Sequence, residues 1–159
     1  MKIAVIDAYH EFHYEVLESL QNALQCEYPY IISGTSYNYH GSASKIQEIV
    51  ERIATKDTQV DPVTRFIYPA ELDKLAMTEW TVDEKMITDC RHIENYFLRL
   101  TDRNAVFPIP VHIRRQYYLI LLNYFNHILR TKHPDLILTF DTPHSYSSYS
   151  FYLLARHYN

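Results

Sequence analysis

The sequence predicts an α/β fold in which a Rossmann-like, mostly parallel sheet is flanked by helices. Short apolar runs typical of strands alternate along the chain with segments in which apolar residues recur at helical spacing. This alternation is the pattern of a parallel sheet with helices on both faces. The chain has 159 residues, of which 47% are hydrophobic and 21% charged, as expected for a single globular domain.

The chain begins with a strand, a helix and a second strand. Lys2–Ala8 is an apolar run that ends in an acid and predicts a buried strand. A helix is expected from Glu11 to about Gln25, because apolar residues recur there every four positions. The second strand is expected at Tyr28–Ser33, just before a glycine.

The next two elements are a helix and a third strand. Ser44 and Gln47 have the spacing of a capping box, which predicts a helix start at Ser44. The helix stripe that follows consists of Ile46, Ile49, Val50 and Ile53. After the break at residues 61–62, a third strand is expected at Val63–Tyr68.

Two further helices are expected in the middle of the chain. Thr81 and Glu84 form a second possible capping box, which predicts a helix start at Thr81. This helix is expected to be long, with an apolar face formed by Met86, Cys90, Ile93, Phe97 and Leu100. The next helix, from about Val111 to Thr131, is apolar on most sides and is expected to lie in the core.

The last strand and the last helix carry the strongest patterns. Asp135–Phe140 is the clearest candidate for a buried strand, and a helix is expected from about Tyr146 to His157. Ligands of parallel sheets bind beyond the carboxyl ends of the strands. Asp7–His13 follows the first strand and Asp141–His144 follows the last. If these two strands are neighbours, both segments line one rim of the sheet.

Composition excludes several classes of protein. With two glycines in the whole chain, neither a dinucleotide-binding glycine motif nor a P-loop can be written. The net charge of −4 argues against a nucleic-acid partner. Two cysteines suggest no disulfide framework, so a cytoplasmic location is expected. No apolar run is long enough for a transmembrane segment.

The rim segments allow two kinds of chemistry. Pro143 stiffens the turn that presents His144 near a helix start, where His144 and Asp141 are candidates for acid–base catalysis. The same turn equally fits an ordinary helix cap. Alternatively, His10, His13, Asp141 and His144 have the spacing of a metal site in a hydrolase, although with nine histidines such spacings also arise by chance.

Four further residues are candidates for substrate binding. His10 and Thr142 lie in the two rim segments. Tyr146 lies in the Ser- and Tyr-rich stretch Ser145–Ser150, which can hydrogen-bond to a sugar and stack on it but is equally typical of a solvent-facing helix start. Arg103 can pair with a phosphate or carboxylate, although a basic residue at that position also suits a helix end.

The stretch from Arg99 to His157 resembles part of the N-terminal domain of glycosyltransferase-like proteins of bacterial capsule and surface polysaccharide synthesis. The shared features, in order, are a Leu-Thr-Asp-Arg-Asn helix end, an aromatic helix, a Pro-Asp-Leu-Ile strand, the Thr-Pro-His turn, and a helix carrying Tyr152 and Ala155. The match covers about the last third of the chain. Only Pro143, His144 and their flanks are distinctive.

This resemblance implies a GT-B architecture, in which two Rossmann-like domains face a cleft. Residues 1–159 would then be a single domain, the acceptor-binding N-terminal half of a larger protein and inactive alone. The glycan acceptor would bind here, whereas the sugar-nucleotide donor would bind a separate C-terminal domain, and this chain would hold no cofactor. A third possibility is a non-catalytic Rossmann-like module that mediates assembly, including homo-oligomers, through its fifteen tyrosines.

Overall fold

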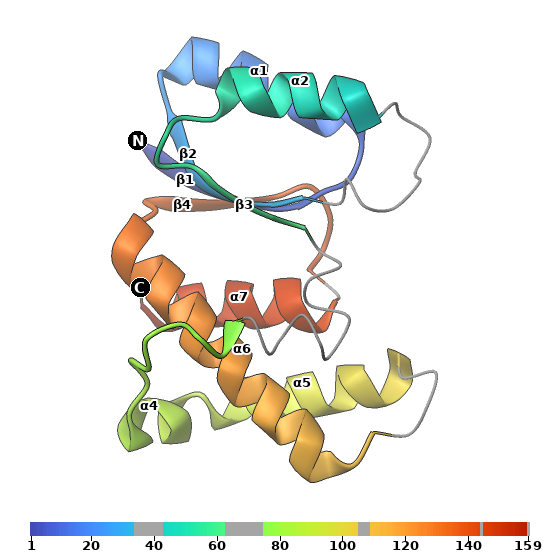
Figure 1. The fold of residues 1–159 in the computed structure, drawn as a ribbon, viewed down its shortest axis with the longest axis vertical. Coiled ribbons are helices and arrows are strands. Elements are labelled where there is room, and N and C mark those ends of the chain that lie inside the picture. The colour runs from blue at the N-terminus through green and yellow to red at the C-terminus, as the bar shows by residue number, and fades with distance from the viewer. Residues whose placement is uncertain (34–42, 63–74, 105–108, 144, 159) are drawn as a thin grey trace. The chain divides into compact units, whose positions relative to one another are not determined.

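The computed structural model describes residues 1–33, 43–62, 75–104, 109–143 and 145–158, and the side chains of 43, 103 and 104 lie outside the description (Figure 1). The chain forms two compact units. Unit 1 consists of Met1–Arg65 and Lys132–Thr142, and unit 2 of Phe66–Thr131 and Pro143–Asn159. Within the described ranges, every helix is too short or too polar to cross a membrane.

Unit 1 contains a four-stranded sheet in which all neighbouring strands are parallel (Figure 1). The strands are β1 (Lys2–Ala8), β2 (Glu27–Ser33), β3 (Gln59–Pro62) and β4 (Leu136–Thr139), and their order across the sheet is β3-β2-β1-β4. Parallel strands joined by helical crossovers are the hallmark of the predicted Rossmann-like α/β fold, which the structure confirms.

The helices α1 (Glu11–Leu24) and α2 (Ala43–Ile53) lie over one face of this sheet (Figure 1). The predicted stripe of α2 is buried and packs with Leu17 of α1 and with Val5 and Ile31 of the strands. Two exposed ion pairs, Lys45–Glu11 and Arg52–Glu18, join the helices at the surface. Apolar burial against the sheet is therefore what holds this layer together.

Two predictions about this unit were wrong in detail. The helix α2 begins at Ala43, one residue before Ser44, so Ser44 is not its N-cap. The strand β4 lies at the edge of the sheet, and Leu136 is 48% exposed, so it is not a fully buried strand. An apolar run predicts a strand but cannot tell an edge from the centre of the sheet. The third strand is β3, while the predicted Val63–Tyr68 lies outside the described residues.

The described part of unit 2 is helical and contains α4 (Glu84–Asp89), α5 (Arg91–Asn104), α6 (Val111–Lys132, whose last residue belongs to unit 1) and α7 (Tyr146–His157). Aromatic contacts join the three long helices. Phe97 of α5 lies 5.6 Å from Tyr118 of α6, and Phe125 of α6 lies 5.1 Å from Phe151 of α7, measured between ring centroids. The predicted burial of α6 is confirmed, since ten of its residues are buried.

The long helix expected after Thr81 is in fact two helices. Asp83 is the N-cap of α4, with its carboxylate accepting a hydrogen bond from the backbone N–H of Met86 at 2.7 Å. Cys90 separates α4 from α5. Thr81 instead donates its N–H to the buried side chain of Asn123 at 2.7 Å. Asp83 has the stronger capping preference and lies one residue before the helix, so the capping-box prediction was wrong.

Candidate functional site

The strands β1 and β4 are direct neighbours, with Ile6 paired to Thr139 at their carboxyl ends. A shared rim was expected only if these two strands are neighbours, and they are. Segments that follow the two strands therefore leave the sheet at the same edge. We refer to the residues of unit 1 at this edge, namely Asp7, Tyr9, His10, His13, Asp141 and Thr142, as the rim site.

Asp7 is a buried carboxylate held in an unusual backbone conformation. Between the pairs Val5–Ile31 and Ala8–Ser33, β1 advances three residues while β2 advances two, so β1 contains a bulge. Asp7 lies in this bulge with φ of 61°, and its side chain is almost fully buried. Such a conformation costs about 1–3 kcal/mol for a residue other than glycine. The bulge turns the carboxylate to where it accepts a hydrogen bond from the hydroxyl of Tyr9.

His13 occupies the first turn of α1 in a fixed orientation. Its Nδ1 accepts the backbone N–H of Tyr9 at 3.1 Å, and the N–H of His10 approaches it at 3.5 Å. Its ring stacks on Phe140, with centroids 4.3 Å apart and planes 4° from parallel. Because Nδ1 accepts, the neutral imidazole carries its proton on Nε2. Within the described part of the chain, Nε2 has no hydrogen-bond partner.

The surroundings of His13 favour this neutral form. Burial lowers the pKa of His13, and the adjacent His10 lowers it further. The carboxylate of Asp141 acts on the same pKa in the opposite direction, which shows that the segment after β4 lies within electrostatic range of His13. The segment after β1 and the segment after β4 therefore interact electrostatically.

The predicted residues His10, Asp141 and Thr142 all lie on the rim. His10 is the exposed N-cap residue of α1, and its ring lies 5.1 Å from that of His13. Asp141 is exposed, and its carboxylate accepts the backbone N–H of Thr142 at 2.7 Å. The hydroxyl of Thr139 donates to the Asp141 carbonyl. Asp141 therefore presents a carboxylate to solvent from a turn stabilised by local hydrogen bonds.

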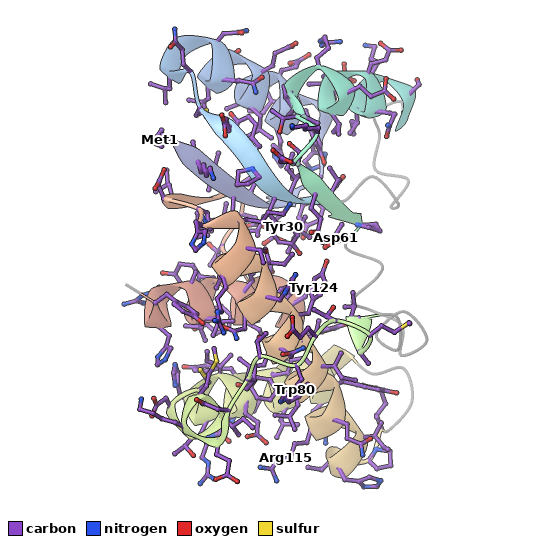
Figure 2. All side chains as sticks on the ribbon, turned by 60° about the vertical axis from the view of Figure 1, so that its left-hand side comes forward. Met1, Tyr30, Asp61, Trp80, Arg115 and Tyr124 are labelled. Carbon is purple, nitrogen blue, oxygen red and sulfur yellow. The ribbon has the colours of Figure 1, made fainter. Side chains whose placement is uncertain are left out.

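Buried polar groups lie near the carboxyl ends of the strands. The Tyr14 hydroxyl donates to the carbonyl of Ala8 at 2.9 Å and contacts the Ser33 hydroxyl at 2.6 Å, which joins α1 to the ends of β1 and β2. Burial raises the pKa of Tyr14 to about 12, so the phenol stays protonated. On β3, the fully buried Asp61 accepts a hydrogen bond from Gln59 at 3.3 Å (Figure 2).

Two of the remaining predicted residues, Tyr146 and Arg103, lie in unit 2. Tyr146 begins α7 in unit 2, where its ring packs edge-to-face against Phe97 at 5.3 Å. Arg103 belongs to α5 of unit 2, and its side chain lies outside the description, as does the whole of His144. The turn before α7 contains the helix cap that the sequence also allowed. Ser145 accepts the backbone N–H of Ser148 at 3.1 Å.

The proposed metal ligands do not form a site in the part of the chain that is described. Among these residues, no three side chains of histidine, cysteine, aspartate or glutamate gather at metal-binding range. In His13, Nδ1 is already occupied by backbone donors. The contribution of His144 lies outside the described residues.

His10 is the residue of the first segment that the sequence named as a substrate-binding candidate. Asp7, Tyr9 and His13 also make contacts that organise the rim. One feature pointed to Asp7, because an acid that ends an apolar strand must be stabilised at the sheet edge. No local pattern pointed to His13, because its stacking partner Phe140 follows β4 and is far away in the sequence.

Comparison with models of protein families, with curated proteins and with solved structures finds no match to this chain. The resemblance to glycosyltransferase-like proteins therefore stays a prediction.

Proposed function

We propose that the rim site binds the hydroxyl groups of a glycan acceptor, and that the chain is the acceptor-side domain of a glycosyltransferase-like protein of polysaccharide biosynthesis. The observation that carries this proposal is the pairing of β1 with β4, which puts the carboxylates of Asp7 and Asp141 on one edge. Carboxylates and a neutral imidazole N–H together suit sugar hydroxyls, which both donate and accept hydrogen bonds.

The rim residues have distinct roles in this proposal. Asp7 is held in the bulge of β1 and accepts a hydrogen bond from Tyr9, and from this position it orients the acceptor. The Nε2–H of His13 donates to an acceptor oxygen. Asp141 is the exposed carboxylate, and it acts with His144 as the base that removes a proton from the attacking hydroxyl. Thr142 and His10 contact the bound sugar at the edge.

The donor half of the reaction belongs to another domain in this proposal. A sugar nucleotide needs a phosphate cradle, and a chain with two glycines cannot form the usual glycine-rich one. We therefore expect the 159-residue chain to bind acceptor but to transfer no sugar. A cytoplasmic location fits the two cysteines, which are both buried as free thiols.

Glycan binding is tested on an array of oligosaccharides prepared from bacterial capsular polysaccharides. Wild-type protein is compared with Asp7→Asn and Asp141→Asn, and the expected loss of binding is at least tenfold for each. The matched control is Asp57→Asn, because Asp57 is an exposed acid in the turn before β3, at the opposite edge of the sheet. Binding that is absent in the wild type, or unchanged in both rim variants, contradicts the proposal.

A further inference from the structure

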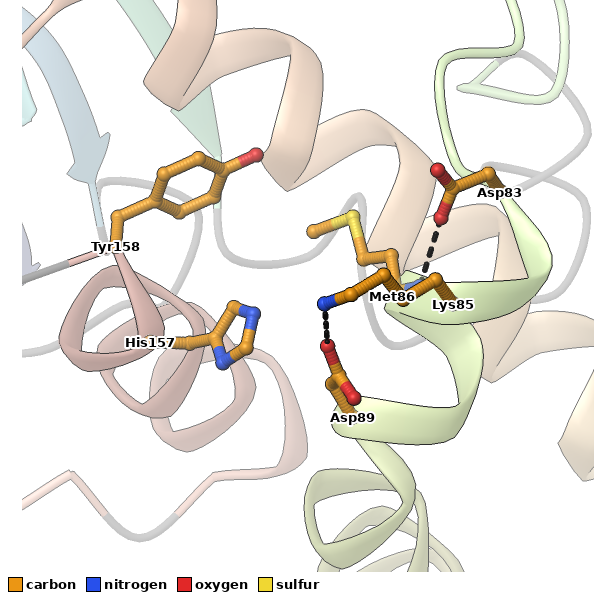
Figure 3. Close-up of a pocket in the computed structure, with 6 residues that line it drawn as sticks. All are labelled: Asp83, Lys85, Met86, Asp89, His157 and Tyr158. Atoms are coloured by element: carbon orange, nitrogen blue, oxygen red, sulfur yellow. Dashed lines mark hydrogen bonds and ion pairs between the residues drawn. The ribbon is translucent and has the colours of Figure 1, made fainter.

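A pocket of about 310 Å³ lies between α4 and the end of α7, and both helices belong to unit 2 (Figure 3). This volume is at the lower end of the range typical of small-molecule sites. None of its residues belongs to the rim site. The lining residues are Asp83, Lys85, Met86, Asp89, His157 and Tyr158.

One side of the pocket is an aromatic corner. The rings of His157 and Tyr158 are nearly perpendicular, at 81°, with centroids 6.2 Å apart. The Tyr158 hydroxyl donates to the side chain of Asn126, which is buried, and this fixes the position of the ring. The Met86 thioether lies on the opposite side of the pocket (Figure 3). These side chains offer an apolar, polarisable surface to a small carbon skeleton.

The charged groups leave the pocket negative. Two carboxylates, Asp83 and Asp89, line it with one ammonium, Lys85, so these three groups together carry a net charge of −1. Lys85 lies 2.6 Å from Asp89, and this ion pair lowers the pKa of Asp89 and raises the pKa of Lys85. Asp83 raises the pKa of Lys85 as well. The pocket thus stabilises a positive charge at the position of the Lys85 ammonium.

Lys85 itself holds that position weakly. Its side chain is 84% exposed, and its ion-pair partner among the described residues is Asp89, one helical turn further along α4. Exposed ion pairs of this spacing contribute little to stability, because ordering a long side chain offsets most of the attraction. The side chain can turn to solvent at small cost. The Lys85 ammonium thus occupies a position that favours a cation and that the side chain can leave easily.

We propose that this pocket binds the ammonium group of a small organic amine, which takes the place of the Lys85 ammonium at Asp89 and lays its carbon skeleton against Tyr158 and Met86. An ammonium ion gains both from the carboxylates and from the face of the tyrosine ring. Amino sugars and aliphatic diamines share this chemistry. The inference is independent of the glycan-binding proposal, since it uses no residue of the rim site.

The test uses the full chain with ¹³C-labelled methionine methyl groups. The chain has three methionines, and Met86 lines the pocket, so its methyl resonance reports binding directly. The probes are D-glucosamine, putrescine and, as an uncharged match to the first, N-acetyl-D-glucosamine. At least one amine is expected to shift the Met86 resonance with a dissociation constant on the order of 1 mM. The tighter of the two amines identifies the carbon skeleton, and the acetylated sugar is expected to bind at least tenfold more weakly.

Two variants test whether the ammonium of Lys85 competes with the ammonium of the ligand for Asp89. Lys85→Gln is expected to tighten amine binding about threefold by removing the competing ammonium, and Asp89→Asn to weaken it about tenfold. The control is Lys45→Gln, which removes an ammonium from another exposed pair, with Glu11 in unit 1, and is expected to leave affinity unchanged. The proposal is overturned if neither amine shifts Met86, if the acetylated sugar binds equally well, or if both lysine variants tighten binding alike.

Discussion

The imidazole of His13 lies flat on the ring of Phe140, with the two centroids 4.3 Å apart and the planes 4° from parallel. This contact joins the first turn of α1 to the residue just before Asp141. The contact holds the His13 ring in place by packing, while the backbone N–H groups of Tyr9 and His10 hold its Nδ1. The rim site is therefore organised before any ligand binds, which reduces the entropy lost on binding.

His13 is expected to make stability depend on pH. The fold lowers the pKa of His13 below its ordinary value of 6.5, so between the two pKa values the unfolded chain binds more protons than the folded chain. The contribution of His13 is therefore fully present above about pH 6.5 and is lost as the pH falls through the folded pKa. Urea denaturation at a series of pH values measures this slope.

His13→Asn removes the titrating group and should flatten that slope. The control is His112→Asn, because His112 is an exposed histidine at the start of α6. A slope that is equally steep in wild type and in His13→Asn would show that His13 is not responsible.

Phe140→Ala is expected to lower the free energy of unfolding by about 2 kcal/mol. Phe140 is partly buried against the core of unit 1 and also supports His13, so its loss removes both contacts. Chemical denaturation measures the change. The comparison is Phe12→Ala, in which a 66% exposed ring is removed and a change near zero is expected. Equal losses in the two variants would contradict the packing role of Phe140.

The contribution of Asp7 to stability can be separated into an effect of its backbone conformation and an effect of its carboxylate. Asp7→Val is expected to destabilise the protein by about 2 kcal/mol or more, since a β-branched residue tolerates φ of 61° poorly. Asp7→Gly relieves the backbone strain but loses the contact with Tyr9, and Asp7→Asn keeps the shape. Thermal unfolding should rank the valine variant lowest. A valine variant as stable as the glycine variant would show that the strain at Asp7 is negligible.

Asn123→Ala is expected to cost about 2–3 kcal/mol and to loosen residues 78–81. The buried amide accepts the N–H of Thr81 at 2.7 Å and donates to the carbonyl of Glu79 at 3.1 Å, and both partners lose this bond. Trp80 is the single tryptophan of the chain and lies in this segment (Figure 2). Its fluorescence anisotropy should therefore fall in the folded variant.

The exposed Asn95 provides the matched control, because Asn95→Ala removes an amide of α5 that lies in solvent. It should change neither stability nor the Trp80 signal. Unaltered anisotropy in folded Asn123→Ala would mean that other contacts hold the segment.

Elements with a strong local pattern could be predicted to within about two residues. The spacing of apolar residues located α1, α6 and α7, and short apolar runs located β1 and β2, because periodicity reflects which side of an element is buried. Features that depend on distant residues could not be predicted. The exposure of β4 follows from its place at the edge of the sheet, and sheet order is not encoded in a local window.

The rim itself followed from a general rule about parallel sheets, but its chemistry did not. Asp141, Thr142 and His10 were placed on the correct edge because each follows a predicted strand. The left-handed backbone of Asp7 arises from a mismatch in register between β1 and β2, which only the pairing of the strands reveals. Likewise, the orientation of His13 depends on Phe140.

The pairing of β1 with β4 also has a consequence for how the protein folds during synthesis. The N–H of Lys2 donates a hydrogen bond of 2.8 Å to the carboxylate of Asp135, which lies 133 residues further along the chain. The strand β1 therefore gains β4 as its second neighbour only after all the residues between them have been made. Until then β1 can pair with β2 alone, and its other edge stays open. Contacts of such long range slow folding, and an unpaired strand edge is prone to aggregation. The emerging chain is therefore most in need of a chaperone between the completion of β2 and the arrival of β4.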